Sequence, residues 1–358
     1  MSRVCLSVLL PLVIGLTRCS DDGDKPPIDT GTPDQAVVDR GPASEASVDG
    51  APWDQAVVDA VQPDTTPVNP SGWAEVMTAP KVLNGIWGAG ANNVFAVGKD
   101  GTIMLWDGSK WGAMTNTEKD DLFAAWGNTT KVWAVGNNGD VYWDGSTWTK
   151  GSSASTSYNF LAVDGGQTNL YAVGTTNYVR YKSQTSTSTS WSSISLSSLL
   201  SGKSLRAIRV FSDSEALAVG DNGVIVQCTA SCTSSSNWKA MTSGVTSHLN
   251  AVWASSNNDI YAVGLDGTVL HYDGTQWSKK NLGTSTYFYG VWGSGASDVW
   301  VVGHPMFKTD ESIFHYDGTS WTKSPPPKTS FLNAVWGSGP KDVWAVGKSN
   351  ILHFTGKP

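Results

Sequence analysis

Most of the histidines and many aspartates of this chain stand at repeated positions, which points to structural rather than catalytic roles. His271 and His315 each precede the Tyr of a His-Tyr-Asp-Gly corner, and His353 is equivalent to them. No Cys/His pair has the spacing of a zinc site. The sequence therefore predicts neither a metal centre nor a cofactor. Four corner aspartates are expected to cap backbone amides within turns: Asp107, Asp144, Asp273 and Asp317.

Two charged side chains interrupt a repeated phrase. A phrase such as Leu-Asn-Ala-Val-Trp recurs along the chain and ends in Trp in five copies, whereas the other two copies end in Asp164 and Arg209. These positions are equivalent in adjacent repeats, so we expect the two side chains to pair where aromatic rings pack elsewhere. Random drift is the alternative. Asp164, Arg209 and the nearby Arg206 are candidate binding residues.

The same two repeats also carry insertions, at Tyr181–Trp191 and Cys228–Trp238. Cys228 and Cys232 lie within the second insertion, and two spare thiols usually oxidise in an exported chain. We predict a disulfide that rigidifies this loop more than it stabilises the fold, because the loop that it closes is short. Both insertions and the expected ion pair should lie on one face of the domain.

A third irregularity is the segment His304–Ser312, which is longer than the tight turns at equivalent positions. We expect it on the opposite face. His304, Lys308 and Asp310 are its candidate ligand-contacting residues. A decorated surface loop without a ligand is the alternative.

The elements that position these residues are predicted by a phrase ending in Ala-Val-Gly or a close variant. Each full copy holds four strand-like runs, and Asn/Asp-Gly turns join the second run to the third. Four antiparallel strands per unit of about 40 residues are typical of a β-propeller. The sequence therefore predicts an all-β, seven-bladed β-propeller of four-stranded antiparallel blades. The seven copies end at Gly98, Gly136, Gly174, Gly220, Gly264, Gly303 and Gly347.

The two ends of the repeat array complement each other. The last copy stops after its third strand, at Ile351–Pro358, whereas a lone fourth-strand sequence, Trp73–Pro80, precedes the first copy. We expect the strand from Trp73 to complete the seventh blade and close the ring, which removes exposed sheet edges. The predicted propeller domain is residues 73–358.

The chain contains 18 tryptophans, and most recur at equivalent positions in several repeats. A residue that recurs in this way is expected to pack one blade against the next. The alternative is a set of shallow aromatic platforms for sugar rings, which would require several exposed rings at one rim.

The N-terminal residues 1–18 are predicted to be a signal peptide, because the apolar run Val4–Leu16 is too short to span a bilayer. The run ends in Leu16–Cys19, which resembles the lipobox of bacterial lipoproteins. That resemblance implies lipidation of Cys19, although Arg18 stands where the motif prefers a small residue. An ordinary secretory signal is the alternative.

Residues 19–72 are predicted to form an acidic, Pro- and Asp-rich disordered linker. Residues 20–70 hold eleven acidic and two basic residues, whereas residues 71–358 hold twenty of each. With few apolar residues to bury, such a segment acts as a tether, with a span of roughly 40 Å. The sequence Asp-Gln-Ala-Val-Val-Asp occurs in it twice, at Asp34–Asp39 and Asp54–Asp59. The neutral propeller has no basic excess to attract nucleic acid.

Three resemblances support the fold. The Tyr-Asp-Gly-x-x-Trp corners at Tyr272–Trp277 and Tyr316–Trp321 resemble the Asp-box of BNR-type propellers, with one residue fewer between Asp and Gly. The order of Ala-Val-Gly, turn and Trp is similar to the Ycf48 type of photosystem-assembly propeller. The phrase Val-Trp-Gly-Ser-Gly-x-x-Asp-Val-Trp-Ala-Val-Gly resembles Trp-rich propeller lipoproteins of myxobacteria. These resemblances imply a fold rather than an activity.

The Asp-box resemblance raises the possibility of a glycosidase, which would need an arginine cluster, a nucleophile and an acid. The propeller has three arginines, Arg180, Arg206 and Arg209, and no nucleophile elbow or phosphate loop. The sequence therefore predicts no catalytic residue. It favours an exported, lipid-anchored, monomeric module of the bacterial cell envelope that binds a protein. The alternatives are a lectin-like glycan binder, a glycoside hydrolase and, for location, a secreted form.

Overall fold

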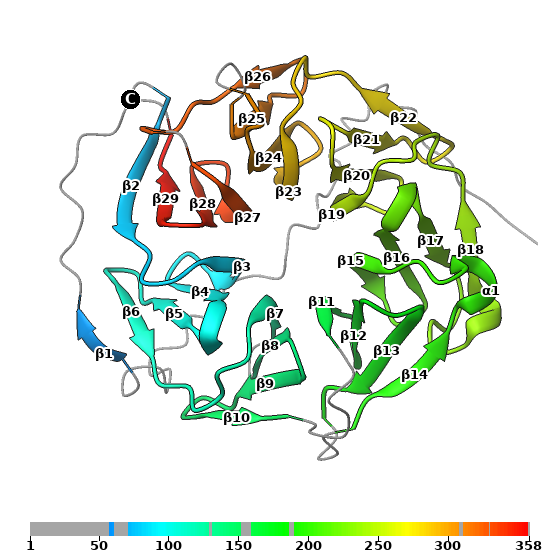
Figure 1. Cartoon of the computed structure of the whole chain (residues 1–358), viewed down its shortest axis with the longest axis horizontal. Helices are drawn as coiled ribbons and strands as arrows, with labels where there is room; N and C mark the ends of the chain where they lie inside the picture. The colour runs from blue at the N-terminus through cyan, green and yellow to red at the C-terminus, as the bar shows by residue number, and fades with distance from the viewer. Residues whose placement is uncertain are drawn as a thin grey trace, which may run out of the picture. The chain divides into compact units, whose positions relative to one another are not determined.

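The computed structural model describes residues 57–60, 71–128, 131–151, 159–185, 190–307, 311–328 and 330–356. Residues 50–358 form one compact unit, in which seven antiparallel sheets surround a central axis (Figure 1). The predicted all-β, seven-bladed propeller is therefore confirmed. Across these described ranges, no helix is long and apolar enough to cross a membrane.

Each blade runs from an inner first strand to an outer fourth strand. Blades 1 to 4 consist of β3 (Leu83–Gly90), β4 (Asn93–Gly98), β5 (Ile103–Trp106) and β6 (Trp111–Met114); β7 (Leu122–Gly127), β8 (Val132–Gly136), β9 (Gly139–Trp143) and β10 (Trp148–Lys150); β11 (Phe160–Gly165), β12 (Asn169–Gly174), β13 (Tyr178–Ser183) and β14 (Ser192–Ser195); and β15 (Leu205–Ser212), β16 (Glu215–Gly220), β17 (Ile225–Cys228) and β18 (Trp238–Met241).

Blades 5 to 7 repeat this order, except that the last blade takes its outer strand from the N-terminal side of the domain. Their strands are β19 (Leu249–Ser256), β20 (Asp259–Gly264), β21 (Val269–Tyr272) and β22 (Trp277–Lys280); β23 (Tyr287–Gly295), β24 (Asp298–His304), β25 (Ile313–Tyr316) and β26 (Trp321–Lys323); and β27 (Leu332–Gly339), β28 (Asp342–Gly347), β29 (Asn350–Phe354) and β2 (Trp73–Thr78). Short helical turns are α1 (Ser197–Leu200), η2 (Lys99–Gly101), η3 (Asp221–Gly223) and η4 (Ser235–Asn237).

The tight turns between second and third strands have the backbone that their sequences predict. Asp100, Asn138, Asn222 and Asp266 all have φ between 53° and 60°, a left-handed conformation that Asn and Asp tolerate better than most residues. Each is followed by a glycine that also has positive φ. These turns reverse the chain within two or three residues and so keep the blades narrow.

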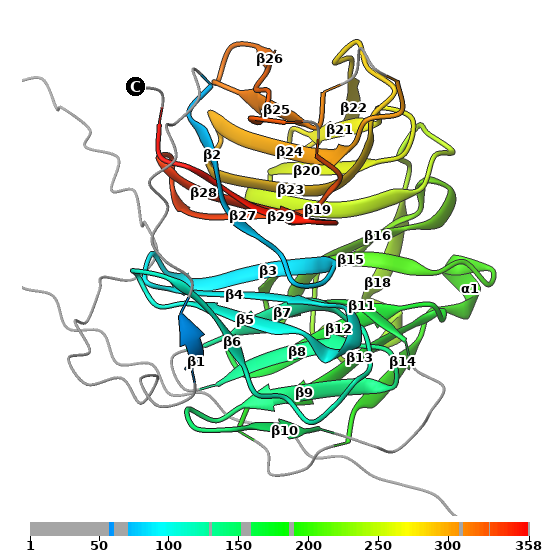
Figure 2. The same ribbon diagram turned by 60° about the vertical axis from the view of Figure 1, so that its left-hand side comes forward.

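The ring closes as expected. β2 pairs with β29 in antiparallel register, with Trp73 opposite Phe354 and Thr78 opposite Asn350. Figures 1 and 2 show β2 lying along β29, although the two come from opposite ends of the domain. Trp73 is fully buried, and its ring meets that of Trp300 in blade 6 edge-to-face at 5.5 Å. The N-terminal strand therefore completes blade 7 and also packs against the preceding blade.

The contacts between neighbouring first strands follow one rule. A Trp near the end of the first strand lies on a Gly of the next blade, so closely that a Cβ on that glycine would come within 2.3–2.7 Å of the indole ring. Real Cβ atoms do not approach other heavy atoms this closely, so only glycine fits there. The five pairs are Trp336–Gly88, Trp87–Gly127, Trp126–Gly165, Trp253–Gly293 and Trp292–Gly337.

Blade 1 has a fifth strand, which comes from the predicted tether. β1 (Val57–Ala60) pairs in antiparallel register with β6, outside the four regular strands. Cys19 and the first Asp-Gln-Ala-Val-Val-Asp copy, at Asp34–Asp39, lie outside the described residues.

The Trp–Gly contact predicts a site-specific intolerance of a single methyl group. Gly165→Ala places a Cβ 2.3 Å from the Trp126 ring, and we expect it to lower the free energy of unfolding by about 1–3 kcal/mol through overpacking. The measurement is urea denaturation. The matched control is Ala254→Gly, at the equivalent position of blade 5, which should cost only about 0.5–1 kcal/mol. Equal effects of the two substitutions would contradict the rule.

Candidate functional site

The propeller has two faces on which the predicted site residues can be placed. The insertion face carries the turns between first and second strands and between third and fourth strands. The hairpin face carries the turns between second and third strands, including Lys99–Gly101 and the segment after His304. The strand registers place Asp164 and Arg209 toward the insertion face, and Arg206 and His304 toward the hairpin face. The six candidate binding residues therefore do not form one site.

Asp164 and Arg209 pair as predicted, with Asp164 Oδ2 3.4 Å from Arg209 Nη1. The same carboxylate accepts hydrogen bonds from the Val210 amide at 2.8 Å and the Gly165 amide at 2.9 Å. Burial raises the pKa of Asp164 above its usual range, although the charge of Arg209 and the two amides oppose that shift. The carboxylate takes the place of the Trp ring that other blades use, and it binds the next blade's backbone instead of covering it.

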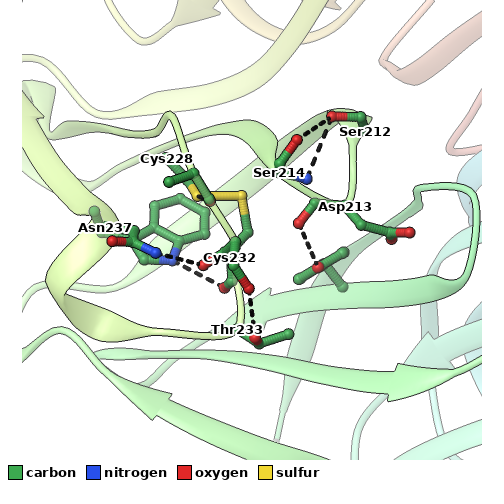
Figure 3. Close-up of a disulfide and its surroundings, with 11 residues drawn as sticks. Ser212, Asp213, Ser214, Cys228, Cys232, Thr233 and Asn237 are labelled. Carbon is green, nitrogen blue, oxygen red and sulfur yellow. Dashed lines mark hydrogen bonds between the residues drawn. A yellow bond between two sulfur atoms is a disulfide. The ribbon is translucent and has the colours of Figure 1, made fainter. Parts of the chain in front are cut away.

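The cysteines of the blade 4 insertion form the predicted disulfide, with an S–S distance of 2.17 Å (Figure 3). Both cysteines are fully buried, in a core cluster that includes Trp238. Trp238 Nε1 donates to the Cys232 carbonyl at 3.2 Å. The disulfide therefore extends the core shared by blades 3 and 4, which goes beyond the loop stiffening that its short span suggests.

Asp213, in the first turn of blade 4, connects this insertion to blade 3. Its carbonyl accepts the Cys232 amide at 3.0 Å and the Tyr171 hydroxyl at 3.3 Å. Its carboxylate accepts the Thr168 amide at 2.9 Å and the Asn169 amide at 3.1 Å. Burial, with the nearby Asp213 charge, raises the pKa of Tyr171 to about 12. The polar groups on this side of blades 3 and 4 are therefore engaged with one another.

The hairpin face contains the mouth of the central channel. The channel is a cavity of about 460 Å³ lined by the first strands of all seven blades. The residue after the first buried apolar residue of each first strand surrounds the mouth, and Arg206 is the one charged residue among these seven. Three of the others, Asn84, Asn250 and Asn333, donate their side-chain amides to a main-chain carbonyl of the next blade at 2.8–2.9 Å. The seven residues are Asn84, Phe123, Leu161, Arg206, Asn250, Tyr289 and Asn333.

Arg206 is half-paired. Its Nε donates to Asp221 Oδ1 at 2.6 Å, and Asp221 also lies 3.1 Å from His248 Nδ1. Burial would raise the pKa of Asp221, but Arg206, the Ser204 amide and the His248 charge together hold it below its usual range. Within the described part of the chain, the Nη groups of Arg206 have no hydrogen-bond partner. A guanidinium with its fork facing a channel mouth can bind an anionic group.

An aromatic row runs outward from the mouth across blades 6 and 7. The His304 ring lies 4.4 Å from Tyr289 and 5.3 Å from Phe331, and its Nε2 is 2.9 Å from Asn333 Oδ1. Lys348 Nζ lies 5.6 Å from the centre of the Phe331 ring. Burial lowers the pKa of His304, and the nearby charge of Lys348 lowers it further, although the Asn333 contact opposes this. Burial of the His304 ring therefore favours its neutral form.

Beside this row lie the large apolar side chains that the described part of the chain leaves exposed. They are Met306 (46%), Phe307 (65%) and Phe331 (43%). Met306 and Phe307 follow directly after β24, so all three belong to the hairpin face of blades 6 and 7. Lys308 and Asp310 lie outside the described residues. The sequence marks His304 in this region as a candidate, but nothing in the repeat pattern marks Phe331, Met306 or Phe307 as exposed.

Ser, Asp and His come together in each of blades 5, 6 and 7, but not as a hydrolase triad. A nucleophilic triad has His between Ser and the carboxylate. Here the carboxylate is central, because Asp298 accepts from both Ser294 and His315, each at 2.5–2.6 Å. Burial would raise the pKa of Asp298, but the hydrogen bonds from His315 and Ser294, together with the charge of His315, help to hold it below its usual range. The equivalent groups are Ser255, Asp259 and His271, and Ser338, Asp342 and His353.

These trios hold the blade together internally. The His315 ring stacks on Trp300 at 4.0 Å, and the His353 ring stacks on Trp344 at 3.7 Å. The corner aspartates cap turns as predicted: Asp273 Oδ1 accepts the amides of Thr275 and Gln276, each at 2.9 Å. These bonds, with the Thr275 hydroxyl, lower the pKa of Asp273 to about 2. In the part of the chain that the structure describes, no three His, Cys, Asp or Glu side chains are grouped to hold a metal ion.

None of the tryptophans in the described part of the chain is fully exposed. All except Trp53 lie in the described residues, and each of those is buried or half-buried. The glycan alternative required several exposed rings at one rim. The exposed aromatic side chains are instead Phe307 and Phe331.

The raised pKa of Asp164 predicts a pH dependence of stability. Because the folded pKa lies above the unfolded value, the folded state binds this proton more tightly, and that stabilisation is lost as pH rises through the folded pKa. Relative to Asp164→Asn, the wild-type protein should therefore lose free energy of unfolding between pH 4 and pH 7, as measured by urea denaturation at each pH.

Asp317→Asn is the control of opposite sign. The pKa of Asp317 is lowered by the Ser320 and Thr319 amides, so its contribution to stability is present above the unfolded pKa and is lost as pH falls through the folded one. A difference between wild type and Asp164→Asn that stays constant or grows with pH would contradict the assignment for Asp164.

Comparison with known proteins shows the fold. YCF48 from Cyanidioschyzon merolae aligns with a TM-score of 0.62 at 14% identity, covering 79% of this chain and 98% of that one. YCF48 bound to D1 peptide aligns at 0.63 and 13%, covering 83% and 98%, and the RRP9 WD40 repeats at 0.65 and 9%, covering 83% and 99%. No protein-family model and no curated protein matches the sequence. These TM-scores establish a common β-propeller fold, and at identities this low they establish the fold alone.

Proposed function

We propose that this chain is an exported, lipid-anchored and monomeric propeller that binds a protein partner on its hairpin face without catalysing a reaction. The supporting observation is that Met306, Phe307 and Phe331, the exposed large apolar side chains of the described residues, all belong to the hairpin-face segments of blades 6 and 7. Large apolar side chains exposed on one face are typical of an interaction site.

The charge around this surface suggests the chemistry of the partner. Arg206 lines the channel, its Nη groups have no hydrogen-bond partner among the described residues, and Lys348 lies over Phe331. A partner segment that carries both an apolar side chain and a carboxylate would satisfy the apolar surface and the cations together. Aromatic and arginine side chains are also the residues that most often dominate binding energy.

Several observations favour a binding role over catalysis. The Ser-Asp-His groups have the carboxylate in the middle, and they recur in three blades as packing elements. The propellers of similar fold include one bound to D1 peptide. The tether and Cys19 would hold the propeller at the cell envelope, as in the Trp-rich propeller lipoproteins that the repeat phrase resembles.

Site-specific photo-crosslinking tests the proposed face. A photoreactive phenylalanine analogue at Phe331, in the full chain in its native membrane, should yield a protein adduct, whereas the same analogue at the exposed Ser236 of the insertion face should not. Adding Arg206→Ala should reduce the adduct by about tenfold, the effect of losing about 1.4 kcal/mol. Adducts from Ser236 alone, or turnover of fluorogenic glycosides by the protein, would contradict the proposal.

The anchor has its own test. Metabolic labelling with radioactive palmitate should mark the wild-type chain and should be lost in Cys19→Ala, because lipidation requires that thiol. Cys5→Ala is the control, since that residue leaves with the signal peptide. Labelling that persists in Cys19→Ala would show that the lipobox resemblance is misleading.

A further inference from the structure

The outer edge of blade 1 differs from the outer edges of the other blades. A fourth strand ends each of the other six sheets, whereas β1 lies outside β6 in the first. Val57 is opposite Met114, Val58 opposite Ala113 and Ala60 opposite Gly112, with an irregularity at Asp59. Figures 1 and 2 both show β1 beside β6.

The composition of the outer strands explains why this edge in particular can accept a strand. Proteins protect sheet edges from pairing with charged side chains, above all Lys. The outer strands of five other blades carry Lys150, Lys239, Lys279, Lys323 or Glu75. β14 is uncharged but consists mainly of serine. β6 reads Trp-Gly-Ala-Met, without a charge, and is therefore an apolar edge that lacks this protection.

The strand that covers this edge comes from the motif repeated in the tether. Val57–Ala60 overlaps the second Asp-Gln-Ala-Val-Val-Asp sequence, and the same six residues stand at Asp34–Asp39. Paired valines favour a strand, whereas a spacer that only has to stay extended needs no repeated sequence motif. The repetition is therefore explained if the motif is a ligand.

We propose that the outer edge of β6 is a β-augmentation site whose occupant is the chain's own Asp-Gln-Ala-Val-Val-Asp motif, bound in cis through Val57–Ala60. Main-chain pairing supplies the affinity in this mode of recognition. Binding leaves residues 61–72 to connect β1 to β2, and it shortens the free spacer to residues 19–56. The site thus sets the reach of the tether, independently of what the hairpin face binds.

Hydrogen exchange of the full chain in detergent micelles tests the proposal. Proline cannot donate to a strand ladder, so Val57→Pro with Val58→Pro should release β1, and amides of Trp111–Met114 should exchange about tenfold faster. The matched control is Val37→Pro with Val38→Pro in the first copy, which should leave their exchange unchanged. Both pairs lie outside the propeller strands and leave its fold intact.

Two further measurements separate the outcomes. The synthetic peptide Asp-Gln-Ala-Val-Val-Asp-Ala should restore slow exchange of Trp111–Met114 in the Val57→Pro, Val58→Pro variant, whereas a peptide with proline at both valines should not. Sedimentation should show a monomer for the wild type. Unchanged exchange even when both copies carry the proline pairs would overturn the site. A wild-type dimer that the Val57→Pro, Val58→Pro variant abolishes would overturn binding in cis.

Discussion

The spacing between blades depends on indole rings that lie directly on glycine backbone. Five of the seven joints between neighbouring first strands use this contact, and a Cβ at any of the glycines would come within 2.7 Å of the ring. An indole buries a large area against a flat partner, and a glycine lets that partner come as close as the backbone allows. The recurrence of Trp-Gly in the repeat phrase is the sequence expression of this constraint.

The two joints without tryptophan are compensated on the other side. Asp164 replaces the ring in blade 3. At the position of blade 4 where the other joints have the receiving glycine stands Val210, whose amide donates to the Asp164 carboxylate. Arg209 replaces the ring in blade 4, and the following position in blade 5 is Ala254, which is buried. In both joints, a side chain other than Trp in one blade therefore faces a residue larger than Gly in the next blade. Asp213 and the buried disulfide connect the same two blades, so these departures preserve the ring.

Most of the fold follows from the sequence because the blade sequence is repeated seven times. The repeats predict the number of blades, the strand order and the turn conformation, and the complementary ends of the array predict closure at Trp73. The Asp164–Arg209 pair follows because both positions break the pattern. The separation of Arg206 from Arg209 also follows from strand geometry, since residues three apart point to opposite faces of a strand and lie about 10 Å apart.

What the sequence does not show is which side chains remain exposed after folding. Phe331 precedes a repeat phrase as an ordinary apolar residue, and only the packed blades reveal that it remains uncovered. Likewise, the paired valines of Val57–Ala60 favour a strand, but the sequence does not show where it pairs, because its partner β6 lies more than fifty residues away.

In a repeated scaffold, side chains that stabilise the fold can be distinguished from side chains that are available to bind another molecule, because the former recur from blade to blade. The Ser-Asp-His groups would attract attention in any other fold, yet they occur in three blades, each with its histidine stacked on an aromatic ring of the same blade, so each serves its own blade. The groups without an equivalent elsewhere are different: Arg206 at a position held by Asn in three blades, the exposed Phe331 and Phe307, and the apolar outer strand β6. The pairing of Asp164 with Arg209 belongs with the first class, because it satisfies a joint. The unrepeated groups are not needed to build the other blades, so contact with a partner is the role that best explains exposed apolar side chains and an arginine on the hairpin face.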